Sequence, residues 1–248
     1  MLSFRVERLV LAALAMTASS AAPQAPQPSE TLNFRVEWRL IHAGDARLVW
    51  GPSSSGGFVA RLHVDSAGLV SKLYRVDNNY ASQLNHELCV ASSKLETREG
   101  SRRRETSVTF DAVRRKASLV DRDLVNGVTV SREIDIQSCE HDVVGALYRL
   151  RAMRLEPGHT AELPISDGRR AVMAKVEAQE RETIKTDFGT YRTIRYEAFL
   201  FNDVLYRRRG RLLLWLTDDA RRLPVQVRVR LPFYIGTVTL QLEKDGKT

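Results

Sequence analysis

Apolar and polar residues alternate strictly over residues 32–40. One face of this segment holds only large apolar side chains, namely Leu32, Phe34, Val36, Trp38 and Leu40. The intervening positions are polar or charged, and a period of two is typical of a half-buried β-strand. A turn around residues 43–45 leads to a second alternating segment through Ala46, Leu48 and Trp50. The pattern therefore predicts a hairpin at the start of the folded region.

Similar short apolar segments, separated by Gly, Ser and Asn-Gly, continue along the chain and predict further strands. In the first half they are Phe58–Val64, Leu69–Val76, Ser107–Phe110, Ala117–Val120 and Val128–Ile136. In the second half they are Ala171–Val176, Arg181–Lys185, Tyr191–Ala198, Leu205–Thr217, Leu223–Leu231 and Ile235–Leu242.

The spacing changes to that of a helix between residues 142 and 155. Asp142 is placed to cap the first turn, and Gly158 follows the last. We expect Val143, Leu147 and Leu150 to face the sheet, because so short a helix needs tertiary packing for its stability. We expect Arg149 and Arg151 to reach solvent or an acidic partner.

These elements predict an all-β fold, a long antiparallel meander curled into a barrel or half-barrel with one short helix. A sheet of this many strands rarely stays flat, because its twist closes it or splits it. The alternative is two small β-barrels or sandwiches in tandem, divided near the helix.

The first 22 residues have the features of a secretory signal peptide. Two arginines, Arg5 and Arg8, precede an apolar run, and small residues follow it at 19–22. Residues 23–31 are rich in Pro and Gln and predict a flexible tether. We expect residues 32–245 to form a single β-rich domain. We therefore expect an exported, periplasmic protein that is not transmembrane in its mature form.

Charge narrows the choice of partners. The chain has 38 basic and 30 acidic residues, and without the predicted signal peptide the balance is 36 against 29, a net charge of +7. An arginine-rich excess favours anionic partners such as lipid, lipopolysaccharide or glycan. Export argues against nucleic acid.

Two cysteines, Cys89 and Cys139, are present in a chain that should meet an oxidising compartment. We expect a disulfide between them, and the alternative is two unpaired buried thiols. No His lies at ligand spacing and no CxxC occurs, so neither a metal site nor a redox site is predicted.

Catalytic motifs are not found. The chain contains no GxSxG, HExxH, Walker loop or GxGxxG sequence. His141 is followed by Asp142, which is better explained as a helix cap, and Asp218 with Asp219 as turn residues. We predict no catalytic residue and no cofactor.

Arginines concentrate near the C-terminus. Arg207, Arg208, Arg209 and Arg211 precede the apolar run 212–216, and the next predicted strand carries Arg228 and Arg230. If the alternate leucines pack inward, Arg209 lies opposite Arg228 and Arg207 opposite Arg230. Opposed like charges destabilise a sheet unless an anion or acidic neighbours offset them, so these four arginines are our candidate binding residues. The alternative is a solvated face neutralised by Glu182, Glu197 or Glu243.

Four segments resemble a known family. They are FRVEWRLIHAGDA (34–46), CEHDVVGALYRLRAMRLEPGHTAELPISDG (139–168), ETIKTDFGTYRTIRYE (182–197) and LLLWLTDDARRLPVQVRVRLPFYIGTVTLQL (212–242). Together they resemble the exported bacterial domain-of-unknown-function family numbered 3108. The resemblance implies a β-rich periplasmic or envelope protein and supplies no catalytic residues.

Three functions remain open. The first is a non-enzymatic envelope protein that binds an amphipathic or anionic component through the arginines and an apolar cavity. The second is a structural or assembly factor that binds an envelope protein through a sheet edge. The third is a hydrolase whose site the sequence does not reveal.

Overall fold

The computed structural model describes residues 29–243. The predicted signal peptide and residues 23–28 of the predicted tether lie outside this range. The first strand begins at Glu30, two residues before the predicted start of the folded region.

The described residues form one antiparallel sheet of fourteen strands in the order β8-β7-β6-β5-β4-β3-β2-β1-β14-β13-β12-β11-β10-β9. The first half consists of β1 (Glu30–Trp38), β2 (Ile41–Pro52), β3 (Phe58–Ser66), β4 (Val76–Leu84), β5 (Val90–Glu99), β6 (Arg102–Asp111), β7 (Lys116–Asp123) and β8 (Val128–Asp135). The second half consists of β9 (Thr160–Ser166), β10 (Ala171–Thr186), β11 (Gly189–Ala198), β12 (Arg211–Thr217), β13 (Pro224–Arg230) and β14 (Thr237–Leu242).

The two halves join where the first strand pairs with the last. Phe34 of β1 lies opposite Leu242 of β14, and Val36 opposite Leu240. Each half is a meander in chain order, so the all-β meander is confirmed, as one continuous open sheet rather than two in tandem.

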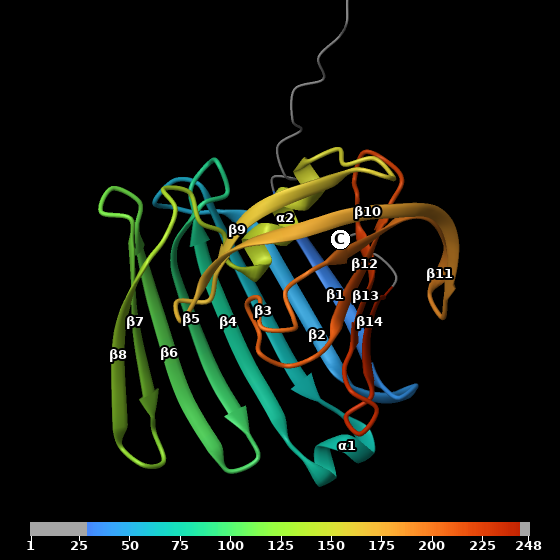
Figure 1. Cartoon of the computed structure of the whole chain (residues 1–248). Coiled ribbons are helices and arrows are strands. Elements are labelled where there is room, and N and C mark those ends of the chain that lie inside the picture. The colour runs from blue at the N-terminus through green and yellow to red at the C-terminus, as the bar shows by residue number, and fades with distance from the viewer. Residues whose placement is uncertain (1–28, 244–248) are drawn as a thin grey trace, which may run out of the picture.

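The sheet curls so that its two ends approach each other (Figure 1). The edge strands β8 and β9 do not pair, and the segment 137–142 lies between β5 and β9 instead. The Val90 N–H donates to the Glu140 carbonyl at 2.8 Å, and the His141 N–H donates to the Pro164 carbonyl at 2.9 Å. A disulfide between Cys89 and Cys139, with Cα atoms 5.0 Å apart, ties the same segment to the start of β5.

The predicted helix, α2 (Val143–Ala152), follows this segment and packs against the concave side of the sheet (Figure 1). The Asp142 carboxylate accepts the Gly145 N–H at 2.6 Å, so the predicted cap is confirmed. Tyr148 stacks on Trp50 of β2 with ring centroids 3.7 Å apart. Arg151 is buried and pairs with Glu30 of β1.

The face that α2 buries differs in part from the predicted one. Leu150 is buried and Leu147 is half-buried, but Val143 is exposed and Val144 and Tyr148 are buried in its place. The first turn of the helix is therefore rotated relative to the predicted face.

Two other predictions are wrong. Residues 69–76 were expected to form a strand, whereas Gly68–Leu73 form the helix α1. Gly68, the first residue of α1, has φ +58° and turns the chain at the start of the helix, and β4 starts only at Val76. Leu40 is not on the inner face but in the β1–β2 turn, 90% exposed.

Candidate functional site

The candidate arginines are divided between a loop and a strand. The predicted strand 205–217 starts only at Arg211, so Arg207, Arg208 and Arg209 lie in the loop 199–210. Arg228 and Arg230 lie on β13.

The predicted pairing of these arginines is wrong. Arg230 lies opposite Arg211, and Arg228 lies opposite Leu213. The partner of Arg228 lies four positions from the predicted one, mainly because the hairpin turn spans residues 218–222, where the Thr217 N–H donates to the Leu223 carbonyl at 2.9 Å. A register shift between Trp215 and Leu216 adds one position. Leu214 and Leu216 do pack in the interior, as expected.

Loop 199–210 is held in a defined conformation by its own hydrogen bonds. The Asn202 N–H donates to the Arg208 carbonyl at 2.9 Å, and the Tyr206 N–H donates to the Leu200 carbonyl at 2.8 Å. The Asn202 side chain also bonds the backbone of Gly210 in both directions, at 3.1 and 3.3 Å. These bonds present Arg207 and Arg208 beside the aromatic rings of Phe201 and Tyr206.

The turn between β9 and β10, residues 167–170, lies against this loop. The Asp167 carboxylate accepts the backbone N–H groups of Arg169 and Arg170 at 2.8 and 3.0 Å, which shapes the turn. The Arg170 guanidinium donates to the carbonyls of Asp203 and Val204 at 3.0 and 3.1 Å. Arg170 therefore holds the two loops together.

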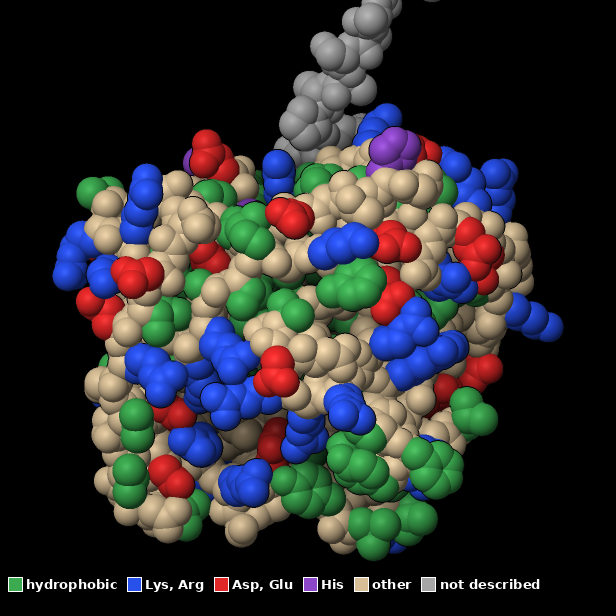
Figure 2. Space-filling view, in the orientation of Figure 1, with side chains coloured by type: hydrophobic (Ala, Val, Ile, Leu, Met, Phe, Trp, Pro, Cys, Tyr) green, Lys and Arg blue, Asp and Glu red, His purple; other side chains and the backbone are tan. Residues whose placement is uncertain are grey.

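The two loops and β8 line an open cavity of about 520 Å³, which we call the arginine hollow. Its basic residues are Arg132 of β8, Arg169, Arg170, Arg207 and Arg208. Its apolar wall consists of Phe201, Leu205 and Tyr206, and Asp167 is its acidic residue. Figure 2 shows that Lys and Arg side chains gather on this face of the molecule, below β9 and β10.

Asp121 of β7 neutralises part of this charge. Burial opposes ionisation of its carboxyl group, but hydrogen bonds from Arg169 and Arg104 hold its pKa below the ordinary value. One carboxylate thus serves two guanidinium groups. Arg132, Arg207 and Arg208 have no carboxylate partner within residues 29–243, so the hollow keeps an excess of positive charge.

Tyr206 adds a polar group to the apolar wall. Burial raises the pKa of its phenol to about 12, and the negative charges of Asp167 and Asp142 act in the same direction. The phenol therefore stays protonated at neutral pH and can donate a hydrogen bond.

A second cavity, of about 420 Å³, holds the β13 arginines. Here carboxylates match much of the charge: Arg211 donates two hydrogen bonds to Glu197, at 2.7 and 2.6 Å, and Arg195 pairs with Glu182 at 3.3 Å. Arg228 lies over the Trp215 ring, 5.1 Å from its centroid. Glu182 and Glu197 are the neutralising residues that the sequence suggested. Arg209 lines neither cavity.

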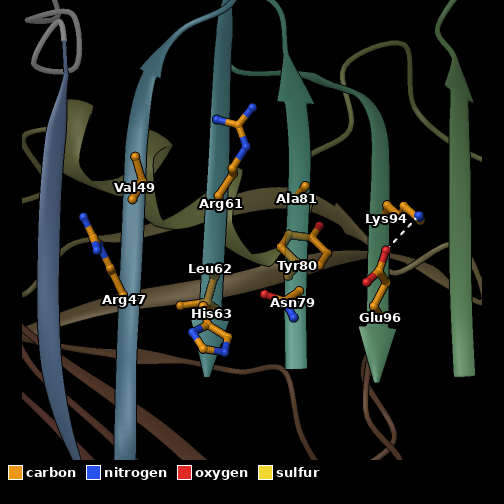
Figure 3. A pocket seen from close by; sticks show the side chains of 10 residues that line it. All are labelled: Arg47, Val49, Arg61, Leu62, His63, Asn79, Tyr80, Ala81, Lys94 and Glu96. Atoms are coloured by element: carbon orange, nitrogen blue, oxygen red, sulfur yellow. Dashed lines mark ion pairs between the residues drawn. The ribbon is translucent and has the colours of Figure 1, made fainter. Parts of the chain in front are cut away.

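A third, smaller depression of about 270 Å³ crosses β2 to β5 (Figure 3). Lys94 pairs with Glu96 at 2.8 Å and with Glu105 at 2.7 Å. His63 contacts Asp77 at 3.2 Å. Paired charges of this kind are typical of a solvated sheet surface.

The residues considered for catalysis or metal binding have structural roles. Burial lowers the pKa of His141, whose Nδ1 lies 2.7 Å from the Leu88 carbonyl. Asp219 accepts the N–H groups of Arg221 and Arg222 at 3.0 Å each, as expected of a turn residue. Among residues 29–243 one group, Glu87, Cys89 and Cys139, meets the spacing of metal ligands, but its two sulfurs are bonded to each other.

The sequence pointed to Arg207 but not to the rest of the hollow. Arg132, Arg169 and Arg170 come from segments far from it in the chain, and Phe201, Leu205 and Tyr206 were read partly as strand. The available signal was the largely apolar segment 199–206, which Asn202 and Asp203 interrupt in the manner of a turn, directly before three arginines and a glycine.

The architecture defines a β-barrel-like protein whose sheet remains open. A family model described as "Protein of unknown function (DUF3108)" matches residues 33–243. The chain belongs to this family, as its four segments predicted.

One solved structure supports the fold. A crystal structure of a β-barrel-like protein of domain of unknown function DUF1849 from Brucella abortus is similar over 88% of this chain and 97% of that chain, with a TM-score of 0.56 and 8% identity. A DUF1089 family protein from Pseudomonas aeruginosa covers 89% of this chain and 95% of its own, with a TM-score of 0.28 and 11% identity. No curated protein matches the chain. Neither helix within residues 29–243 is long and apolar enough to cross a membrane.

Proposed function

We propose that this protein is a non-enzymatic binding protein of the bacterial cell envelope that holds an anionic amphipathic molecule in the arginine hollow. The observation that carries the proposal is the meeting of unpaired arginines with an apolar wall in one cavity. The predicted signal peptide supports an address in the periplasm, and a disulfide suits that compartment.

The two sides of the hollow suit the two ends of such a ligand. Arg132, Arg207 and Arg208 are free to donate paired hydrogen bonds to a phosphate or carboxylate group, which guanidinium recognises better than ammonium does. Phe201 and Tyr206, both half-buried, offer apolar ring surface to a hydrocarbon chain. A volume of about 520 Å³ is within the usual range for small-molecule sites.

The apolar wall favours a lipid-like ligand over a free glycan. A glycan would leave the accessible ring surfaces of Phe201 and Tyr206 without an apolar partner, and its hydroxyl groups would face few acceptors there. Phospholipid and lipopolysaccharide both supply an anionic group attached to acyl chains, so they share the chemistry that the hollow would recognise.

The rival function, binding of an envelope protein through a sheet edge, has one observation in its favour. The outer edge of β8 pairs with no strand within residues 29–243. However, β8 carries Arg132, Glu133 and Asp135, and charges on an edge strand oppose addition of another strand. The hollow is therefore the better-supported site.

Dodecyl phosphate is a suitable probe, with dodecanol and inorganic phosphate as the two half-ligands. We expect calorimetric titration to detect dodecyl phosphate binding that is tighter than binding of either half-ligand and that weakens with salt. Native mass spectrometry of protein from its own envelope would identify the natural ligand.

Charge reversal locates the site. Arg207→Glu with Arg208→Glu should weaken dodecyl phosphate binding at least about tenfold, because charge-assisted hydrogen bonds are lost. Arg209→Glu is the control, since it reverses one charge in the same loop at a residue that does not line the hollow, and each single variant, Arg207→Glu and Arg208→Glu, is compared with it. If dodecyl phosphate binding is lost only in the Arg228→Glu, Arg230→Glu variant, the binding site is the second cavity. Equal binding by all variants would refute both positions.

A further inference from the structure

The helix α1, the β1–β2 turn and the β13–β14 turn lie at one end of the molecule (Figure 1). Large apolar side chains on these segments are exposed. We call this group the apolar tip: Leu40, Leu69, Leu73, Tyr74, Phe233 and Tyr234. Phe233 is 94% exposed, Tyr234 78% and Leu73 75%. In Figure 2 hydrophobic side chains gather at the same end of the molecule.

The three segments that form the apolar tip are bonded to one another. The Arg39 guanidinium donates to the carbonyls of Phe233 and Tyr234 at 2.8 and 3.0 Å, which joins the β1–β2 turn to the β13–β14 turn. The Ala67 N–H donates to the Ala43 carbonyl at 2.9 Å, which joins α1 to β2. The apolar side chains are therefore presented by a rigid frame.

Folding does not explain the residue at position 40. Arg39 and Leu40 both have positive φ, +51° and +67°, in a two-residue hairpin turn that favours Asn-Gly. Leucine there destabilises the backbone and leaves its side chain in water. Such a choice points to a contact outside the chain.

The turns and the helix that form the apolar tip carry only basic charges, whereas Asp45, Asp65, Asp77 and Glu99 lie on the adjoining ends of the strands. Segments 39–41, 66–75, 100–103 and 231–236 contain Arg39, Lys72, Arg75, Arg102 and Arg103 but no Asp or Glu. The Gly100 N–H donates to the Arg75 carbonyl at 2.8 Å, so the β5–β6 turn belongs to the same end. Exposed aromatic and leucine side chains with basic side chains beside them are typical of a surface that enters a lipid interface.

We propose that the apolar tip docks on an anionic phospholipid bilayer, with Leu40, Leu73, Phe233 and Tyr234 entering the headgroup region. This inference is independent of the function proposed for the arginine hollow, since the residues are different. A second copy of the chain is a poorer occupant, because a two-fold contact would bring the same basic segments together. A fluid bilayer can accommodate separate projecting turns.

Trp38 provides an internal reporter. Its indole N–H donates to the Ile235 carbonyl at 2.7 Å, directly beneath the apolar tip, and it is half-buried. The other two tryptophans, Trp50 and Trp215, are buried in the core. Quenching by brominated acyl chains would therefore come from Trp38.

The test uses purified protein with vesicles of equal parts phosphatidylcholine and phosphatidylglycerol. We expect co-sedimentation with these vesicles, much less with pure phosphatidylcholine, and quenching of Trp38 by brominated lipid. Leu40→Ser with Phe233→Ser and Tyr234→Ser should weaken binding about tenfold or more. Val113→Ser, at a 95% exposed position in the β6–β7 turn, is the matched control and should bind normally.

Lys72→Glu with Arg75→Glu tests the basic residues beside the apolar tip. It changes no apolar side chain and no backbone hydrogen bond, and it should also weaken binding to the vesicles. Melting temperatures identify any variant that has lost its fold. If the serine variant has lost its fold, binding by the Lys72→Glu, Arg75→Glu variant tests membrane docking alone. Wild-type binding by the serine and charge variants, or an unquenched Trp38, would refute docking. A wild-type dimer that the serine variant dissociates would assign the apolar tip to a second copy instead.

Discussion

Glu140 is a buried carboxyl group at the point where the two ends of the sheet meet. Its backbone carbonyl accepts from Val90, and its Oε2 accepts the Gln137 N–H at 2.9 Å. Its Oε1 has no hydrogen-bond partner among the described residues. Burial raises the pKa of this carboxyl group to about 7.

The raised pKa predicts that the protein loses stability as the pH rises. Below the ordinary value of 4.5 the group is protonated in both states, whereas between 4.5 and about 7 the folded state keeps a proton that the unfolded state has released. The free energy of unfolding should fall by up to about 3 kcal/mol across this window and then level off. Denaturant unfolding at several pH values measures the change.

Glu140→Gln is the control, since an amide oxygen can still accept the Gln137 N–H but does not titrate. The difference in stability between wild type and variant should follow the same pH window. A difference that is independent of pH would contradict the assignment.

At the scale of one element, α2 shows how a short helix depends on its surroundings. Two hydrogen bonds join the helix to strands far away in the chain. The Tyr80 hydroxyl of β4 donates to the capping Asp142 carboxylate at 2.6 Å, and the Tyr148 hydroxyl of α2 donates to the Glu30 carboxylate of β1 at 2.7 Å. Its apolar side chains enter two core clusters, and Leu147 contacts both. The helix therefore connects the two halves of the sheet.

Leu147→Ala should lower the free energy of unfolding by about 2 kcal/mol, near the lower end for a core leucine because the side chain is only half-buried. Val143→Ala, on the exposed start of the same helix, should change it by less than about 0.5 kcal/mol. Thermal or denaturant unfolding of both variants checks the order. Equal effects would mean that α2 does not pack as described.

At the scale of the whole molecule, the sheet stays open, and its two ends are held together by the segment 137–142 rather than by strand pairing. His141 forms an isolated bridge with Ile165 of β9, and Cys139 is bonded to Cys89 at the start of β5. Beyond this junction, β6 and β7 pack against the β9–β10 turn, where a Cβ at Gly168 would lie 2.6 Å from Val108. The closure thus depends on a few covalent and polar contacts.

Replacing both cysteines by serine should destabilise the protein by about 4 kcal/mol in the chain-entropy model, since the disulfide closes a loop across a sequence separation of 50. Unfolding of oxidised wild type, reduced wild type and the double variant measures this. We expect the reduced and double-variant proteins to agree. No loss of stability on reduction would show that the junction holds without the disulfide.

The candidate site was predictable only in part. A run of arginines before the apolar segment 212–216 is visible in the chain, and it marked Arg207. The hollow itself needs β8 and the β9–β10 turn, which reach loop 199–210 only because the sheet curls. The predicted pairing failed because β12 begins at Arg211, because the β12–β13 turn is centred later than predicted, and because a register shift after Trp215 adds one position.

The sequence by itself determined the features that depend on neighbours in the chain. Strict alternation placed β1, and an aspartate before an apolar helical stripe placed α2 and its cap. Polar residues on both faces concealed β4 and β5, because strands such as 76–84 carry Asn78, Asn79 and Ser82 without a clear period. The tertiary structure alone decided the β1–β14 pairing, the burial of Glu30 against Arg151 and the arginine hollow. Each of these joins segments far apart in the chain, and local hydrophobic periodicity holds no information about which distant segments will meet.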